Sequence, residues 1–252
     1  MTLLEARGVT KRFAGIVALD DVDLACDERE IVGLIGPNGA GKTTLFNCLT
    51  GVLRPDAGRV LFEGKDLGAL AVHRRARLGI ARTFQRMELF AGMTVRDHLL
   101  VADRAHRRAG GLPSDLVLRG RIHPSERDRV DRVLAQLGLL DDGDRPVDAL
   151  SLGTGRLVEL GRALITEPRL VFLDEPFSGL DRIETDEVVA TLQAAHAERD
   201  VAIVLVEHDV TAVQHLCERV VVLDYGRVIA SGPTDTVLED PAVRRAYLGV
   251  TE

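Results

Sequence analysis

An α/β domain built around a mainly parallel sheet is the fold class that this sequence predicts, and two features carry the prediction. Short apolar runs rich in β-branched residues alternate with longer segments of helical periodicity along most of the chain. Three of these runs, residues 31–35, 170–173 and 201–206, lack the polar alternation of a half-exposed strand. We expect them to be central parallel strands that are covered on both faces.

A second, smaller sheet is predicted beside this core. Residues 3–9, 18–24 and 59–64 alternate apolar and polar side chains and are bounded by turn residues. This pattern is typical of short antiparallel strands with one face exposed. We therefore expect a small antiparallel β subdomain next to the parallel core.

The middle of the chain predicts an inserted helical subdomain at residues 86–164. Thr94 and Asp97 have the spacing of a capping box, and residues 125–139 repeat apolar side chains at helical spacing. A loop is expected at 110–124, where Gly and Pro are followed by an arginine-rich stretch. No internal repeat is visible, so we expect one domain over 1–252, with its catalytic core in 1–85 and 165–252.

Composition and charge exclude several classes of protein. The 252 residues are 46% hydrophobic and 28% charged, which is too apolar for a disordered chain, and the net charge of −7 argues against a general nucleic-acid binder. Cys26, Cys48 and Cys217 form no metal or disulfide pattern, and Cys48 is expected to pack, so a reducing intracellular compartment is expected. No apolar run approaches the roughly 20 residues of a membrane span. Any work at a membrane therefore requires a partner.

A phosphate-binding loop follows the first central strand. The segment satisfies G-x-x-x-x-G-K-[ST] and lies directly between a predicted strand and a predicted helix. Its glycines allow the backbone to wrap around phosphates, Lys42 supplies a positive charge, and the Thr43 hydroxyl can bind Mg²⁺. The loop residues are Gly36, Pro37, Asn38, Gly39, Ala40, Gly41, Lys42, Thr43 and Thr44.

Polar residues end the other two central strands. Asp174 and Glu175 follow the second strand, and His208 follows the third. Carboxyl ends of parallel strands share one edge of a sheet, where open α/β folds keep their sites. There Asp174 can hold Mg²⁺ through water, Glu175 can polarise an attacking water, and His208 can contact a γ-phosphate or orient that water. The alternatives are a solvated turn at Asp174 and Glu175, and a surface histidine or a satisfied core histidine at His208.

The order of these motifs resembles that of the ATP-binding cassette (ABC) ATPases over essentially the whole chain. Residues 36–44 match the Walker A motif, residues 170–175 the Walker B motif, and residues 178–181 the D-loop, which ends at Asp181. Gln85 matches the glutamine of the Q-loop, and His208 the switch histidine. The resemblance implies a P-loop NTPase cassette with a RecA-like parallel-sheet core, an antiparallel β subdomain and an inserted helical subdomain.

The same resemblance implies roles for individual residues. Lys42 and Thr43 would bind the phosphates of ATP and Mg²⁺, Gln85 and Asp174 would complete the metal site, and Glu175 would be the general base. Gln85 would also sense the membrane partner. Phe13 stands where the family places an aromatic ring that stacks on adenine, the alternative being core packing.

The signature motif departs from the family pattern. Ser151 and Gly153 are retained, and by resemblance they would contact the γ-phosphate of an ATP bound to a partner cassette. Thr154 replaces the family's glutamine. Our hypothesis is a reduced but real hydrolysis in a site that two cassettes complete together.

Flanking stretches resemble the ATPases of branched-chain amino acid importers and of their amide and urea transport relatives. They comprise residues 82–90, 93–101 and 240–249, although the lipopolysaccharide-export ATPase has a similar end. The importer resemblance implies two multi-span permeases, a second ATPase (homo- or heterodimer), an extracytoplasmic binding protein, and peripheral attachment at the cytoplasmic face of the inner membrane. We expect no nucleic-acid partner.

Two further expectations concern partners and alternatives. Met87, Leu89 and Phe90 are the expected groove for a permease helix, the alternative being packing inside the helical subdomain. The alternative functions are an ATPase of a lipopolysaccharide-export-type system, a soluble ABC ATPase not coupled to transport, and a subunit that binds ATP but hardly hydrolyses it.

Overall fold

The computed structural model describes residues 1–83, 88–107 and 122–248, and the chain divides into two compact units. The first unit consists of Met1–Arg82, Arg169–Glu175 and Asp200–Glu252. The second consists of Thr83–Pro168 and Pro176–Arg199. This division places the long helix α7 (Arg182–Arg199) with the helical segment, whereas residues 165–252 were expected to belong to the core.

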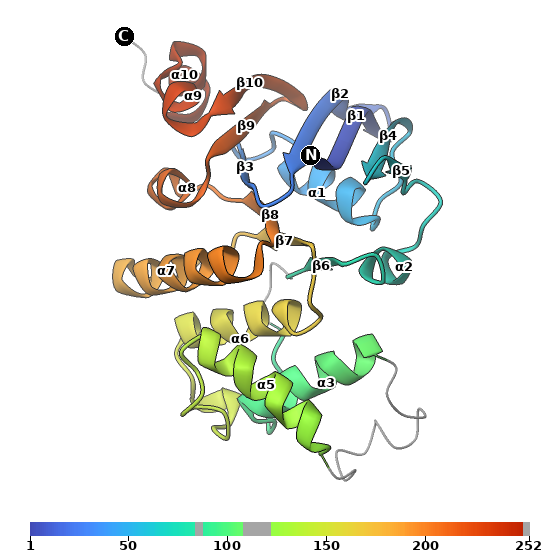
Figure 1. Cartoon of the computed structure of the whole chain (residues 1–252). Helices are drawn as coiled ribbons and strands as arrows, with labels where there is room; N and C mark the ends of the chain where they lie inside the picture. Colours follow the sequence, from blue (N-terminus) through green and yellow to red (C-terminus); the bar gives the residue numbers. More distant parts are fainter. Residues whose placement is uncertain (84–87, 108–121, 249–252) are drawn as a thin grey trace. The chain divides into compact units, whose positions relative to one another are not determined.

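A six-stranded sheet of order β10-β9-β3-β8-β7-β6 forms the centre of the first unit (Figure 1). All neighbouring strands are parallel except β10, which pairs antiparallel with β9. Every residue of β3, β7 and β8 is buried, which confirms the prediction of central parallel strands. The strands are β3 (Ile31–Ile35), β6 (Ile80–Arg82), β7 (Leu170–Asp174), β8 (Ala202–Val206), β9 (Arg219–Asp224) and β10 (Arg227–Pro233).

The second sheet of this unit has four strands in the order β2-β1-β4-β5, and its pairs are antiparallel, as predicted. Its strands are β1 (Thr2–Phe13), β2 (Ile16–Asp27), β4 (Ala57–Phe62) and β5 (Lys65–Asp66). β1 and β2 extend beyond the predicted ranges, and the register of their pairing shifts at several points, among them between Ala6 and Val9 and between Val9 and Lys11.

Most helices of the first unit follow strands of the six-stranded sheet, whereas α2 lies between β5 and β6 in the sequence. The Phe46 ring of α1 packs edge-on against Phe172 of β7, with ring centroids 5.5 Å apart, so α1 is fixed to the centre of the sheet. In Figure 1, α9 and α10 follow β10 near the C-terminus. The helices are α1 (Lys42–Thr50), α2 (Val72–Ala76), α8 (Val210–Leu216), α9 (Thr234–Glu239) and α10 (Pro241–Leu248).

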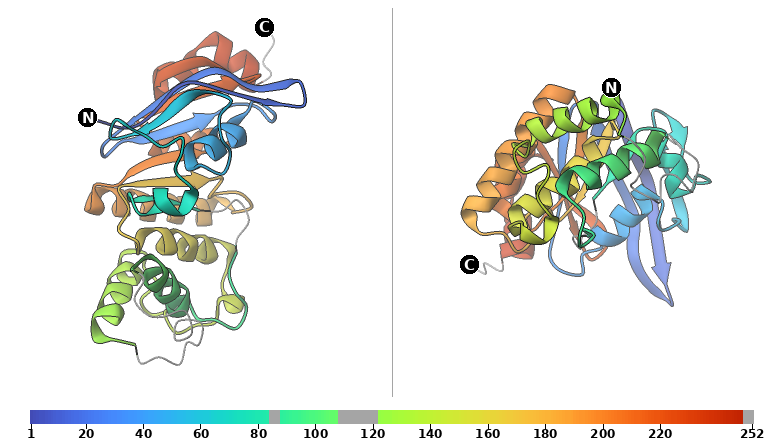
Figure 2. Two further views of the ribbon diagram at one scale, coloured as in Figure 1. Left: turned by 90° about the vertical axis from the view of Figure 1, so that its right-hand side faces the viewer. Right: turned by 90° about the horizontal axis from the view of Figure 1, so that it is seen from below.

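The second unit is helical and consists of α3 (Val95–Arg107), α5 (Pro124–Gln136), the short 3₁₀ helix Val147–Ala149, α6 (Leu152–Leu164) and α7. Figure 2 shows α3, α5 and α6 side by side. The capping box predicted at α3 is present, because Asp97 N–H donates to Thr94 Oγ1 and Thr94 N–H to Asp97 Oδ2, both at 3.1 Å. The loop predicted at 110–124 lies mostly outside the described residues.

Candidate functional site

The phosphate-binding loop connects β3 to α1. Gly36 begins it, and a Cβ at this position would lie 2.1 Å from the carbonyl oxygen of Leu223 on β9, so no other residue fits there. Gly41 ends it at the N-cap of α1 with φ of 104°, a left-handed conformation that favours glycine. Strand, loop and helix therefore have the arrangement that places helix N–H groups and a turn of backbone around an anion.

Lys42 is the first residue of α1 and is only 7% exposed. Its ammonium group donates to the carbonyl oxygens of Gly36 at 2.6 Å and Pro37 at 3.0 Å. Burial lowers the pKa of Lys42, and the nearby carboxylates of Glu175, Asp174 and Glu207 oppose that shift. The loop thus holds a positive charge inside itself, on carbonyl oxygens that a phosphate oxygen can replace.

Two carboxylates follow β7 at the same edge of the sheet. Asp174 pairs with Val206 of β8, and Leu34 of β3 pairs with that same Val206, so the strand ends that carry the motifs are adjacent. Burial raises the pKa of Asp174, and the Glu175 carboxylate adds to the increase, while Arg82 and Lys42 lower it. Glu175 has a positive φ of 49° and its N–H donates to the Val206 carbonyl at 2.9 Å. Glu175 is thus attached to the end of the neighbouring strand through its backbone.

His208 follows β8 and its side chain is 59% exposed. The preceding residue, Glu207, is completely buried, and its carboxylate accepts a hydrogen bond from His208 N–H at 3.0 Å. The Glu207 carboxylate also lies 3.6 Å from His208 Nδ1. The structure therefore brings Lys42, Asp174, Glu175 and His208 to one edge of the parallel sheet.

Phe13 ends β1 and is 43% exposed, so the alternative of core packing is not what the structure shows. The Lys11 ammonium lies 5.5 Å from the centre of its ring, and Lys11 itself donates to Asp56 and to the Arg54 carbonyl. An exposed ring of this kind offers a surface for stacking with another flat group.

The signature residues lie in the second unit. Ser151 is the N-cap of α6, and its Oγ accepts from Thr154 N–H at 3.2 Å and lies 3.2 Å from Thr154 Oγ1. Asp181 accepts from Glu184 N–H at 2.9 Å before the first turn of α7. The structure does not place these residues relative to the phosphate-binding loop. Gln85 lies outside the described residues.

The expected permease groove is described only in part, because Met87 lies outside the described residues. Leu89 is half-buried and Phe90 is 57% exposed. Phe90 N–H donates to Nε2 of the buried His98 at 2.9 Å, and the two rings stack at 5.9 Å between centroids. Phe90 is therefore held at the surface of the helical unit.

Two charged residues of the first unit were not assigned a role in the sequence analysis. Arg82 of β6 lies with its guanidinium 5.3 Å from the Phe46 ring centre and lowers the pKa of Asp174. Glu207 is the fully buried carboxylate beside His208. The available signal for both was a charged residue at the end of an apolar strand. Cys48 is buried and burial raises its pKa to about 11, which agrees with packing.

Comparison with known proteins shows which family has this arrangement. A family model described as ABC transporter matches residues 19–178. The chain belongs to the ABC transporter ATP-binding proteins. It is thus an ATP-hydrolysing cassette that binds ATP, and a second model, described as branched-chain amino acid ATP-binding cassette transporter, matches residues 227–252.

Individual relatives of this cassette match over nearly the full chain. It is 37% identical to the high-affinity branched-chain amino acid transport ATP-binding protein BraF of Pseudomonas aeruginosa, and 40% to LivG of Salmonella typhimurium, with 98% of each chain covered. The lipopolysaccharide export ATP-binding protein LptB of Haemophilus influenzae is 32% identical over 99% of this chain and 98% of the relative. Identity is thus lower for this exporter relative than for the two amino acid transport proteins.

A solved structure supports the fold assignment. An ABC transporter cassette in its ADP conformation has a TM-score of 0.84 and 31% identity, over 99% of this chain and 100% of that one. Across the three described stretches of the chain, none of the helices combines the length and the apolar content that a membrane span requires.

Proposed function

We propose that this cassette is the ATP-hydrolysing subunit of an importer for branched-chain amino acids or related small amino acids, amides or urea. The observation that best supports ATP hydrolysis is that the buried Lys42 lies near Asp174 and Glu175 at one edge of the parallel sheet. ATP is the nucleotide that its family binds. Its resemblance to BraF and LivG carries the substrate class.

The phosphate-binding loop and Lys42 bind the phosphates of ATP. The Lys42 ammonium exchanges its two carbonyl partners for phosphate oxygens, which keeps the buried charge hydrogen-bonded throughout. The exposed ring of Phe13 stacks on adenine. Residues 36–44 thus supply the backbone N–H groups and side chains that hold the triphosphate.

The residues at the strand ends fit Mg²⁺ by the chemistry of their donors. Thr43 is exposed in the first turn of α1. Asp174 is a buried carboxylate, and with Glu175 and Glu207 it gives this edge of the sheet more negative charges than Arg82 and Lys42 neutralise. A hydroxyl, a carboxylate and substrate phosphates are the oxygen ligands that Mg²⁺ takes in such sites. Thr43, Asp174 and Gln85 would hold the ion, which neutralises phosphate charge when bound.

Glu175 acts as the general base and His208 as the residue that contacts the γ-phosphate and orients the attacking water. The N–H of Glu175 is bonded to the Val206 carbonyl, which holds its backbone at the end of β7 beside the buried Asp174. The water loses its proton toward Glu175 as its oxygen attacks the γ-phosphorus and the bond to the leaving ADP oxygen breaks.

A second cassette completes the site. Ser151 and Gly153 contact the γ-phosphate of the ATP held by the partner cassette, and Asp181 lies beside that contact. Thr154 reduces hydrolysis at the site that this signature completes, and a partner with a glutamine in that position would complement it. Closure of the two cassettes around ATP drives transport.

The partners of the cassette are two multi-span permeases and a second ATPase, which is either another copy of this chain or a related one. An extracytoplasmic binding protein delivers the substrate to the permeases. The cassette attaches peripherally at the cytoplasmic face of the inner membrane, with Phe90 on the surface that receives a permease helix. The hydrogen bond from Phe90 N–H to His98 Nε2 holds the backbone at this position.

The test is a census of partners by mass spectrometry. The chain with Glu175→Gln is purified from detergent-solubilised native membranes in the presence of ATP, and the wild-type chain without nucleotide is the control. The proposal predicts two multi-span permeases and a second ATPase, enriched in the variant. Recovery of soluble partners alone would support an ATPase that is not coupled to transport, and recovery of lipopolysaccharide-export components would support an ATPase of an export-type system.

A further inference from the structure

One carboxylate of the helical unit links the N-termini of two helices. Glu184 Oε1 accepts from Gly153 N–H in the first turn of α6 at 3.2 Å, and Oε2 accepts from Asp181 N–H at the start of α7 at 3.4 Å. Asp181 accepts in return from Glu184 N–H at 2.9 Å. Glu184 therefore belongs to the capping box of α7 and reaches across to α6.

Other contacts in this unit hold the same two segments together. A Cβ on Gly179 would lie 3.1 Å from the Leu152 side chain, and Arg156 Nη2 donates to the Ser178 carbonyl at 3.5 Å. A Cβ on Gly153 would lie 3.2 Å from Glu184 Cβ and 3.3 Å from its Cγ and Cδ. The absence of a side chain at Gly153 is therefore what allows Glu184 to lie against the start of α6.

The position of the Glu184 carboxylate is that of an anion at a helix N-terminus. Such an anion is stabilised by the N–H groups of the first turn and by the helix dipole. A bound phosphate oxygen requires the same N–H groups and carries the same sign of charge. Two anions compete for this place because the second one meets both an occupied donor and a like charge.

We propose that Glu184 is an internal competitor of the γ-phosphate for the Gly153 N–H group. This inference rests on the proposed function, in which Gly153 faces the ATP of the partner cassette. When that ATP arrives, its γ-phosphate replaces the carboxylate at Gly153. Glu184 keeps its bond to Asp181, so one of the contacts between the start of α7 and the start of α6 is lost in the same step, while those of Leu152 and Arg156 remain.

The competition has a consequence of definite sign. Removing the charge of Glu184 weakens its hydrogen bond to Gly153 N–H and removes its repulsion of the γ-phosphate. Closure of the two cassettes around ATP should then occur at a lower ATP concentration. A merely structural role of Glu184 predicts the opposite, because loss of a cap weakens the helical unit and its ability to close. Glu184→Gln removes the charge and retains the size of the side chain and one acceptor oxygen, which can accept from one of the two N–H groups, and is therefore the conservative test.

The experiment measures ATP trapping by the purified transporter complex in which this chain carries Glu175→Gln. Radiolabelled ATP retained after rapid gel filtration is followed against ATP concentration. With Glu184→Gln added, we expect half-maximal trapping at an ATP concentration about 3- to 10-fold lower, since charge-assisted hydrogen bonds are about twice as strong as neutral ones. Binding of a fluorescent ATP analogue to the isolated full chain, which reports its own phosphate-binding loop, should not change.

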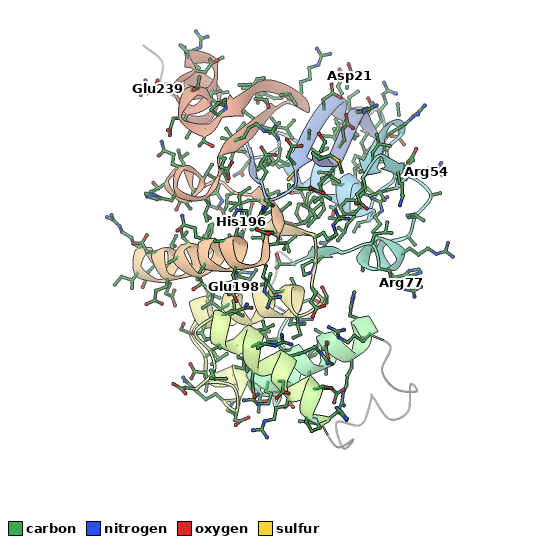
Figure 3. The ribbon with its side chains drawn as sticks, in the orientation of Figure 1. Asp21, Arg54, Arg77, His196, Glu198 and Glu239 are labelled. Atoms are coloured by element: carbon green, nitrogen blue, oxygen red, sulfur yellow. The ribbon has the colours of Figure 1, made fainter. Side chains whose placement is uncertain are left out.

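The matched control is Glu198→Gln, which removes the same charge from the exposed far end of α7 (Figure 3). It should leave trapping unchanged. A second variant, Glu184→Ala, removes both bonds and should trap at an ATP concentration at least as low as Glu184→Gln does, even if thermal melting shows lower stability. If the ATP concentration for half-maximal trapping is unchanged or higher in both Glu184 variants, Glu184 does not compete with the γ-phosphate. Failure of Glu175→Gln alone to trap ATP would instead contradict the proposed function, and the competition with it.

Discussion

Gly153 N–H and the Glu184 carboxylate, 3.2 Å apart, connect the signature segment to the start of α7 within one compact unit. The two residues are 31 positions apart in the sequence, and each belongs to a segment with a recognisable motif of its own. The contact shows that the donor assigned to phosphate recognition has an internal anionic partner in the structure described here.

The signature departure makes a testable prediction. The Thr154 hydroxyl lies 3.2 Å from Ser151 Oγ and can accept the serine proton that a phosphate would otherwise take. Thr154→Gln removes this hydroxyl, and we expect the turnover of ATP by the assembled transporter to rise by roughly 3- to 10-fold, the worth of about one hydrogen bond. Steady-state phosphate release measures it, with Ser151→Ala as the variant that should lower turnover. An unchanged rate would show that the departure is neutral.

Phe13 is expected to contribute to ATP affinity through stacking. Phe13→Ala should weaken binding by roughly 5- to 150-fold, which corresponds to about 1–3 kcal/mol per stacked base, and Phe13→Tyr should retain most of the affinity. Ile16 pairs with Phe13 across the hairpin and is 71% exposed, so Ile16→Ala is the matched control. Isothermal titration with a non-hydrolysable ATP analogue measures the affinity. Equal affinities for Phe13→Ala and the wild type would exclude stacking.

Lys42 is expected to contribute binding and not folding. Its ammonium donates only to loop carbonyls among the described contacts, so Lys42→Ala should change the melting temperature little. It should weaken ATP binding by about 10- to 100-fold, since a hydrogen bond to a charged group is worth about 1.5–3 kcal/mol. Lys65→Ala, at an exposed lysine of β5, is the control. If the Lys42→Ala variant binds ATP as tightly as the wild type, Lys42 is not a phosphate ligand.

A buried ion pair in the helical unit gives a prediction about pH. Arg104 donates to both Glu126 oxygens at 2.9 and 2.8 Å, and these bonds, with a further one from His123 N–H, lower the pKa of Glu126 to about 2. Because the folded pKa lies below the unfolded value, the stabilisation is complete at neutral pH and is lost as the pH falls from about 5 to 2.

Glu126→Gln should therefore lower the free energy of unfolding by about 3 kcal/mol at pH 7, and this difference from the wild type should shrink toward pH 2. Urea denaturation followed by circular dichroism measures both values. Glu187→Gln, at an exposed glutamate of α7, should show no comparable loss. A difference that stays constant between pH 7 and pH 2.5 would argue against the low pKa.

The parts of the fold that the sequence predicted are those with short-range signals. A run of buried β-branched residues identifies β3 without knowledge of its neighbours, and the phosphate loop is a local pattern between a strand and a helix. The order of the strands in the sheet, by contrast, has no local sequence pattern that predicts it. Ile31 pairs with Ile203, and Val32 with Arg219, so the sheet is decided by residues far apart in the chain.

Within the site, the sequence predicted motif residues but not their neighbours. Glu207 was visible as a charged residue after an apolar strand, yet its complete burial depends on how the surrounding elements pack around it. Glu184 carried only the signal of a capping box at Asp181. Its second bond, to Gly153, requires α6 and α7 to pack together, which no local pattern specifies.

The most direct measurement of the central claim is uptake of radiolabelled leucine, isoleucine and valine by cells whose copy of this chain has been deleted. We predict that the high-affinity uptake of at least one of them is lost, is restored by the wild-type chain, and is not restored by Glu175→Gln at the same protein level. Unchanged uptake of all three and of small amides and urea in the deletion strain would contradict the account.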